Sequence, residues 1–188
     1  MINLNQMFDE FNATYRIKEP GNTSKLIKDE LLEMLAEIPT SPEHAKECAD
    51  TIYISLQQLR AKGVDVNEAV ANPPTLSYVN FDIIAKLITD NTALNDNKNI
   101  IALVAATISY MKILGYKWQL ILEEVHRSNM SKTVPYAQVE EELKAVRERY
   151  PNAYIVEGQQ DCILKCADTN KVIKPSCYSK AVIKPEWI

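Results

Sequence analysis

Apolar residues recur along most of the chain at the three- and four-residue spacing of amphipathic helices. One face of the second such segment carries only apolar side chains, namely Ile27, Leu31, Met34, Leu35 and Ile38. The pattern predicts helices over residues 4–15, 24–38, 42–62, 78–89, 97–114, 118–127 and 136–149. A mainly α-helical bundle is therefore expected.

The clearest helix boundary in the sequence is the start of the third helix. Ser41 is placed to cap it, Pro42 fits its first turn, and Glu43 lies at the positive end of the helix dipole. Gly63 is expected to end it, and Ser24 is expected to cap the preceding helix. Because the linker between these two helices is short, we predict that they are antiparallel neighbours.

After Pro151 the pattern changes from helix-like to strand-like. Short strands are predicted at 154–156, 161–166 and 171–173, with a turn at 168–170. We therefore expect a helical domain over 1–133, followed by a tail over 134–188 that holds one helix and a small β-hairpin.

The helical part contains a weak internal repeat. At an offset of 52 residues, residues 28–67 match 80–119 without a gap in their apolar pattern, and Gly63 falls on Gly115, so the two copies cover about 24–70 and 76–125. Two similar helix pairs would build a four-helix bundle, although any two antiparallel pairs share this periodicity. The acids differ between the copies: Glu30, Glu33, Glu47 and Asp50 correspond to Asp82, Ala85, Asn99 and Ala102. The first copy therefore carries the candidate functional residues, and the second copy is expected to be structural.

Composition excludes several classes of function. The 188 residues include 21 Lys and Arg against 25 Asp and Glu, a net charge of −4, with no basic run, so duplex nucleic acid is not an expected partner. The four glycines are dispersed, which excludes a P-loop and a Rossmann fingerprint. If the protein binds nucleotides, it must hold phosphate in another way.

No membrane partner is expected either. The longest apolar stretch, 100–111, is too short to cross a bilayer and fits a buried core helix. The polar N-terminus does not resemble a signal peptide, and the four cysteines lack the spacing of a zinc site. We predict a cytoplasmic protein with free thiols.

Two pairs of acids stand out for their spacing. Glu30 and Glu33 share one helical face, as do Glu47 and Asp50 on the next helix. Antiparallel packing of these helices could gather all four carboxylates into a site for a hard cation, Mg²⁺ or Mn²⁺. Both pairs lie off the apolar stripes, however, which fits plain solvent exposure equally well.

Four segments resemble one family. Residues 25–33 (KLIKDELLE) and 47–53 (ECADTIY) are similar to the E-x-x-E and E-x-x-D helices of the all-α nucleoside triphosphate pyrophosphohydrolases, a superfamily that contains MazG, phosphoribosyl-ATP pyrophosphohydrolase and the dimeric dUTPases. Residues 125–132 (VHRSNMSK) resemble the V-H-x-S-N-M-S-K segment of its MazG-like, phage-type members. Residues 171–175 (KVIKP), with Tyr178 and Pro185, resemble their closing segment.

The resemblance implies a MazG-like helical bundle that hydrolyses a nucleoside triphosphate to monophosphate and pyrophosphate with Mg²⁺. By position, Glu30, Glu33, Glu47 and Asp50 would be metal ligands, and Glu30 or Glu33 would also orient the water. The substrate would contact a further group of residues, namely Lys25, Asn129, Lys132, Lys171, Lys174 and Tyr178. A homo-oligomer, either a dimer or a tetramer, is also implied.

The sequence departs from this family in one important respect. In simpler members the E-x-x-D helix leads almost directly into the V-H-x-S-N-M-S-K segment, whereas residues 64–117 intervene here. Whether Asn129 and Lys132 meet the carboxylates within one subunit or across an interface is left open. The alternative function is a catalytically weak nucleotide-binding or protein-interaction module on the same scaffold, because the second copy has lost its acids.

Overall fold

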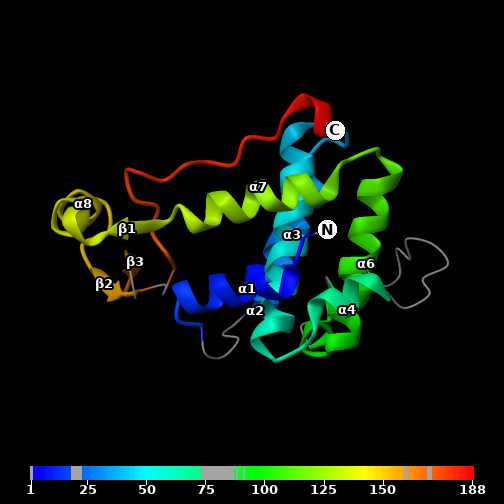
Figure 1. Ribbon diagram of the computed structural model, residues 1–188, viewed down its shortest axis with the longest axis horizontal. Helices are drawn as coiled ribbons and strands as arrows, with labels where there is room; N and C mark the ends of the chain where they lie inside the picture. Colours follow the sequence, from blue (N-terminus) through cyan, green and yellow to red (C-terminus); the bar gives the residue numbers. More distant parts are fainter. Residues whose placement is uncertain are drawn as a thin grey trace.

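The computed structural model describes residues 2–17, 23–72, 87, 89–90, 92–158, 161–168 and 171–188. In this part of the chain the fold is mainly helical, with a small antiparallel sheet near one end (Figure 1), as predicted. The predicted helix over 78–89 lies outside the described residues except for Leu87 and Thr89, which are helical. The helices are α1 (Leu4–Thr14), α2 (Thr23–Ala36), α3 (Pro42–Ala61), α4 (Val66–Ala71), α6 (Asn97–Ile113), α7 (Trp118–Met130) and α8 (Val139–Arg147).

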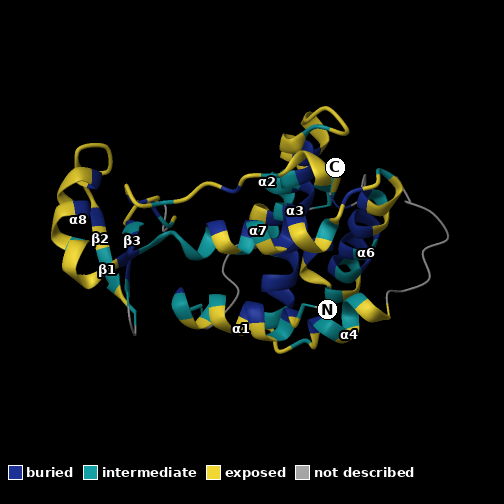
Figure 2. Cartoon of the chain, turned by 45° about the horizontal axis from the view of Figure 1, so that its top comes forward, coloured by how far each residue is buried: buried dark blue, intermediate teal, exposed yellow. Residues whose placement is uncertain are grey.

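Helix α3 is the centre of the helical body, the name used here for α1 to α7. It contacts α1, α2, α4, α6 and α7, and most of its length is buried (Figure 2). Its start is as predicted: the Ser41 side chain accepts a hydrogen bond from the His44 backbone N–H, and Pro42 opens the helix. Gly63 follows its end with a φ of +80°, a left-handed conformation that glycine adopts without strain.

The start of α2 differs from the prediction. Ser24 lies inside the helix, which already includes Thr23, and its hydroxyl donates to Asn95 Oδ1 at 2.9 Å. The helix also ends at Ala36, two residues earlier than predicted. Ser24 therefore joins α2 to the 3-10 turn Ala93–Asn95 rather than capping α2.

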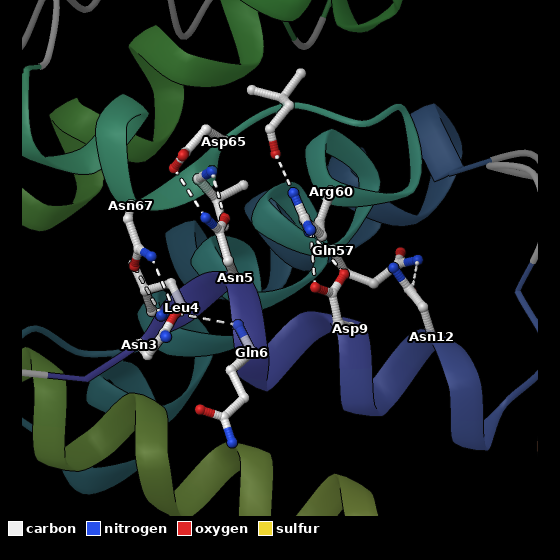
Figure 3. A network of polar contacts seen from close by, with 12 residues as sticks. Asn3, Leu4, Asn5, Gln6, Asp9, Asn12, Gln57, Arg60, Asp65 and Asn67 are labelled. Atoms are coloured by element: carbon white, nitrogen blue, oxygen red, sulfur yellow. Dashed lines mark hydrogen bonds and ion pairs between the residues drawn. The ribbon is translucent and has the colours of Figure 1, made fainter.

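A network of polar side chains fixes α1 against α3 and α4 (Figure 3). Arg60 donates two hydrogen bonds to the carboxylate of Asp9, at 2.7 and 2.8 Å. Asn5 accepts from the backbone N–H of Val66 and donates to Asp65. Bidentate and charge-assisted bonds of this kind fix orientation more firmly than a single neutral bond. They hold α1 in place beside the C-terminal half of α3.

The sheet unit, residues 133–173, packs around a second small apolar cluster at the end of α7. It contains β1 (Thr133–Pro135), α8, β2 (Ala153–Glu157) and β3 (Asp161–Cys166), with antiparallel strand order β1-β3-β2. Strands β2 and β3 fall on two of the predicted strands, and they pair with each other, with Ala153 opposite Cys166 and Glu157 opposite Cys162.

The remaining details of the sheet unit correct the sequence prediction. The third strand is β1, in which Val134 pairs with Cys162, and not residues 171–173, where Val172 forms only an isolated bridge with Lys165. The helix predicted over 136–149 is a 3-10 turn (Tyr136–Gln138) followed by α8. Two residues of the turn predicted at 168–170 lie outside the described part of the chain.

Beyond the sheet unit the chain returns to the helical body. Residues 174–182, called the strap here, run beside α7 towards the 3-10 turn Pro185–Trp187, where Trp187 packs on the main core (Figure 1). The backbone N–H of Lys117 donates to the Trp187 carbonyl at 2.8 Å. Since the tail contributes to both apolar clusters, the division into domains at residue 133 stays a prediction.

The second copy of the predicted repeat is described only in part. Helix α6 has the predicted bounds to within one residue, packs against α3 and ends before Gly115, whose φ is +83°. Asp82 and Ala85 lie outside the described residues. No single described helix is long and apolar enough to cross a membrane; α6 and α7 meet that test only as a pair bent by 118°.

Candidate functional site

A cavity of about 340 Å³ lies between α2, α3, α7 and the strap. It brings together most of the residues that the motifs single out: Glu30, Glu33, Asp50, Asn129, Lys132, Lys174 and Tyr178. Most of its remaining lining is apolar or aromatic, formed by Phe11, Leu26, Tyr53, Ile54, Val125 and Ala181. A cavity of this size with a few convergent polar groups is typical of a ligand site.

Three carboxylates meet beside this cavity, and two of them, Glu30 and Asp50, line it. Oxygen atoms of Glu30 from α2 and of Glu47 and Asp50 from α3 all lie within 4.8 Å of one another. The close packing of α2 against α3 produces this triad. Glu33, one turn further along α2, is exposed and lines the cavity without joining the triad. The predicted cluster of four acids is therefore a triad with a neighbour.

The triad carboxylates are partly buried rather than on an open surface. The side chains of Glu47 and Asp50 are 13% and 20% exposed. Glu47 Oε2 is buried and has no hydrogen-bond partner among the residues that the structure describes. A buried carboxylate oxygen without a partner is costly, and the three acids together offer oxygen ligands of the kind that Mg²⁺ prefers. The donor set therefore fits a divalent cation.

Burial also changes the proton affinity of the triad. It raises the pKa of Glu30 to about 7, with further contributions from the negative charges of Asp50, Glu33 and Glu47. Burial likewise raises the pKa of Asp50, although the Lys46 ammonium opposes the change. Both raised pKa values mean that the surroundings disfavour the charged forms of Glu30 and Asp50. Carboxyl groups with raised pKa values are typical of functional sites.

Lys46 is a site residue that the sequence interpretation missed. Its Nζ lies 2.7 Å from Glu47 Oε1 and 2.6 Å from Asp50 Oδ2, and it lines the cavity. Burial lowers the pKa of this lysine, but the charges of Asp50 and Glu47 outweigh burial and raise it above its ordinary value. The i, i+4 spacing of Lys46 and Asp50 was the signal that could have identified it.

The C-terminal end of α7 supplies the opposite wall. Lys132 Nζ donates to Asn129 Oδ1 at 2.6 Å, and the Asn129 carbonyl accepts from the Tyr15 hydroxyl at 2.6 Å. Burial lowers the pKa of Lys132, and the nearby Lys174 lowers it further. Asn129 and Lys132 thus line the same cavity as Asp50 within one chain, although residues 64–117 intervene in the sequence.

The strap closes the cavity from the side. Lys174 Nζ lies 4.9 Å from the ring centroid of Tyr178, whose hydroxyl is hydrogen-bonded to Ser128 Oγ at 3.1 Å. Between them, Ser176 donates both its backbone N–H and its hydroxyl to the buried carboxylate of Glu142 on α8. The strap is therefore attached to α7 and to the sheet unit at the point where it lines the cavity.

Two predicted substrate contacts do not reach the cavity. Lys25 lies on the outer face of α2, where its Nζ is 3.8 Å from Asp29 Oδ2. Five residues separate it from Glu30, a rotation of about 140° around the helix. Lys171 is an exposed residue of the sheet unit, where its carbonyl accepts from the Cys166 N–H. Neither lines the cavity in the structure.

Comparison with known proteins identifies no relative of this chain. No protein-family model matches the chain, and neither a curated protein nor a solved structure matches it. The resemblance to the all-α pyrophosphohydrolases thus rests on the motifs alone, and membership of that family, like the dimer or tetramer that it implies, stays a prediction.

Proposed function

We propose that this chain is a Mg²⁺-dependent nucleoside triphosphate pyrophosphohydrolase, which hydrolyses a nucleotide or deoxynucleotide between its α and β phosphates. One observation carries the proposal: Glu30 and Asp50, two members of the partly buried triad with Glu47, line the same cavity as Lys132 of the opposite wall and Lys174 of the strap. Carboxylates around a cation, faced by Lys132 and Lys174, are complementary to a metal–triphosphate complex.

The two lysines are suited to an anion. Their mutual repulsion contributes to the lowered pKa of Lys132, so a phosphate placed between them would relieve an unfavourable interaction. Asn129 positions Lys132 through the 2.6 Å hydrogen bond, and its carbonyl is held by Tyr15. This arrangement gives the phosphates a binding site without a glycine-rich loop.

The proposed reaction is attack of water on phosphorus. Mg²⁺ held by the triad would neutralise triphosphate charge and polarise the bond that breaks. Glu33 lines the cavity next to the triad and is the carboxylate that we expect to orient the water and accept its proton. The oxygen of water bonds to phosphorus, the bridging P–O bond breaks, and pyrophosphate leaves as Lys132 and Lys174 offset its charge.

The test is pyrophosphate release from a panel of nucleoside and deoxynucleoside triphosphates, with Mg²⁺ or with EDTA. We expect Mg²⁺-dependent release by the wild type and loss of at least about a hundredfold in the Glu47→Gln variant. Glu43→Gln, an exposed acid in the first turn of the same helix, is the matched control and should retain activity. No release with any nucleotide at high enzyme concentration would refute the proposal, and release of phosphate alone would mean that another bond is cut.

A catalytically weak nucleotide-binding or interaction module is the second candidate. It is favoured by α6, which carries Asn99 and Ala102 at the positions that correspond to Glu47 and Asp50 on α3. Binding of a nucleotide without any hydrolysis would support this function instead.

A further inference from the structure

Lys46 presents a conflict within the proposed site. Its ammonium group is bound to one oxygen of Glu47 and one of Asp50, at 2.7 and 2.6 Å. These two carboxylates are also two of the three members of the triad. Lys46 therefore forms ion pairs with two of the carboxylates that, in the proposed function, bind a divalent cation.

The ammonium group and a divalent cation compete for the same negative charge. Mg²⁺ or Mn²⁺ bound by Glu30, Glu47 and Asp50 would lie within a few ångströms of Lys46 Nζ, in surroundings where repulsion between like charges is only weakly screened. The lysine side chain has a flexible stem, so it can leave the carboxylates without any change in α3. Movement of this one side chain is the simplest way to relieve the repulsion.

The cavity offers a second position for this ammonium group. Lys46 lines the cavity from the α3 side, while Lys132 and Lys174 line it from α7 and the strap. A triphosphate that occupied the cavity would lie between these walls. Lys46 could then exchange two carboxylates for phosphate oxygens and keep its charge balanced throughout.

We propose that Lys46 is a resident counter-ion of the triad, which releases Glu47 and Asp50 when a divalent cation binds and then contacts a substrate phosphate. The inference rests on the proposed function and deepens it. It implies that the metal binds weakly on its own, because Lys46 must be displaced, and that phosphate favours metal binding by giving Lys46 a new partner.

The test is Mn²⁺ binding to the full chain without nucleotide, measured by calorimetry or by the electron paramagnetic resonance signal of free Mn²⁺ at pH 8. Lys46→Met removes the competing charge and should tighten Mn²⁺ binding about tenfold, which corresponds to about 1.4 kcal/mol. Lys46→Arg keeps the charge and should bind Mn²⁺ within about twofold of the wild type.

Lys62→Met is the matched control for the change in net charge. Lys62 follows the end of the same helix, about 24 Å along its axis from Lys46, and donates to Asn97 instead. Its loss should leave Mn²⁺ affinity within about twofold of the wild type. If the enzyme is active, Lys46→Met should also raise the KM for the nucleotide about tenfold at saturating Mg²⁺, as expected for a lost charged contact.

The outcomes separate the inference from the proposed function. Tighter Mn²⁺ binding by Lys46→Met alone supports the inference. If the wild type binds Mn²⁺ clearly and Lys46→Met binds it equally or more weakly, the inference is overturned. Lys46 would then orient the carboxylates, and the metal site would be unaffected. Absence of Mn²⁺ binding from the wild type and from Lys46→Met alike would overturn the metal site and the proposed function with it.

Discussion

Replacement of Glu30 by glutamine should make the metal-free protein more stable, although it removes a proposed metal ligand. Glu30 is partly buried beside Asp50 and Glu47, and its pKa is raised from 4.5 to about 7. The folded state therefore disfavours the ionised carboxylate. Glutamine has nearly the same shape and carries no charge, so the variant avoids this cost.

The magnitude follows from the pKa. A carboxyl with a raised pKa costs no stability well below its unfolded value of 4.5, and the cost grows until the pH passes the folded value of about 7. At about 1.4 kcal/mol per pKa unit, the full cost is about 3 kcal/mol. Because Glu30 keeps some contact with solvent, we expect about 2 kcal/mol at pH 8, or a rise in Tm of about 4–8 °C for a chain of this size.

The assay is thermal or urea unfolding in EDTA at several pH values from 5 to 8. The difference between Glu30→Gln and wild type isolates Glu30, because His44 and His126, whose pKa values burial lowers, titrate in both proteins. The gain should be largest at pH 8 and fall to about a quarter of that value at pH 5. Glu123→Gln, an exposed acid on α7, should show no such gain.

Two results would refute this reasoning. If Glu30→Gln is no more stable than the wild type at pH 8, the ionised Glu30 carboxylate does not lower the stability of the folded state. If the gain is the same at pH 5 as at pH 8, it comes from packing or a new hydrogen bond and not from charge.

Three further predictions concern the metal, the strap and α7. Metal at a hundred times its Kd should stabilise the wild type by about 2.7 kcal/mol in thermal unfolding, and Glu47→Gln should lose this effect. Glu142→Ala should raise the KM for the nucleotide about threefold to tenfold, because the Ser176 anchor of the strap is lost, while Glu142→Gln retains an acceptor and the wild-type KM; equal KM values for both variants would exclude a positioning role. Tyr53→Phe removes the 2.9 Å hydrogen bond to His126 Nδ1 and should lower the free energy of unfolding by about 1 kcal/mol in urea titrations.

The sequence predicts well those features that depend on nearby residues. The start of α3 follows from Ser41 and Pro42, whose capping and backbone preferences act within one turn. The hairpin of β2 and β3 likewise joins neighbouring segments. Strand β1 could not be predicted in this way, because three residues that end in a proline show no alternation and are ordered by pairing with β3, about 28 residues away.

The site shows the same division. The E-x-x-E and E-x-x-D spacings placed Glu30, Glu47 and Asp50 correctly, because they depend only on helix geometry and on the short linker from α2 to α3. The helical wheel could not distinguish exposed acids from a site, since the second wall comes from α7 and the strap, far along the chain. Lys25 was assigned to the site from a motif, but a rotation of about 140° from Glu30 places it outside the cavity.

A crystal structure with Mn²⁺ and a nonhydrolysable deoxynucleoside triphosphate would test the central claim most directly, because Mn²⁺ can be identified by its anomalous scattering. We predict that the metal binds to oxygens of Glu30, Glu47 and Asp50, and that the phosphates lie between it and the ammonium groups of Lys132 and Lys174. A nucleotide bound elsewhere, or a cavity that holds neither metal nor phosphate at saturating concentrations, would contradict it.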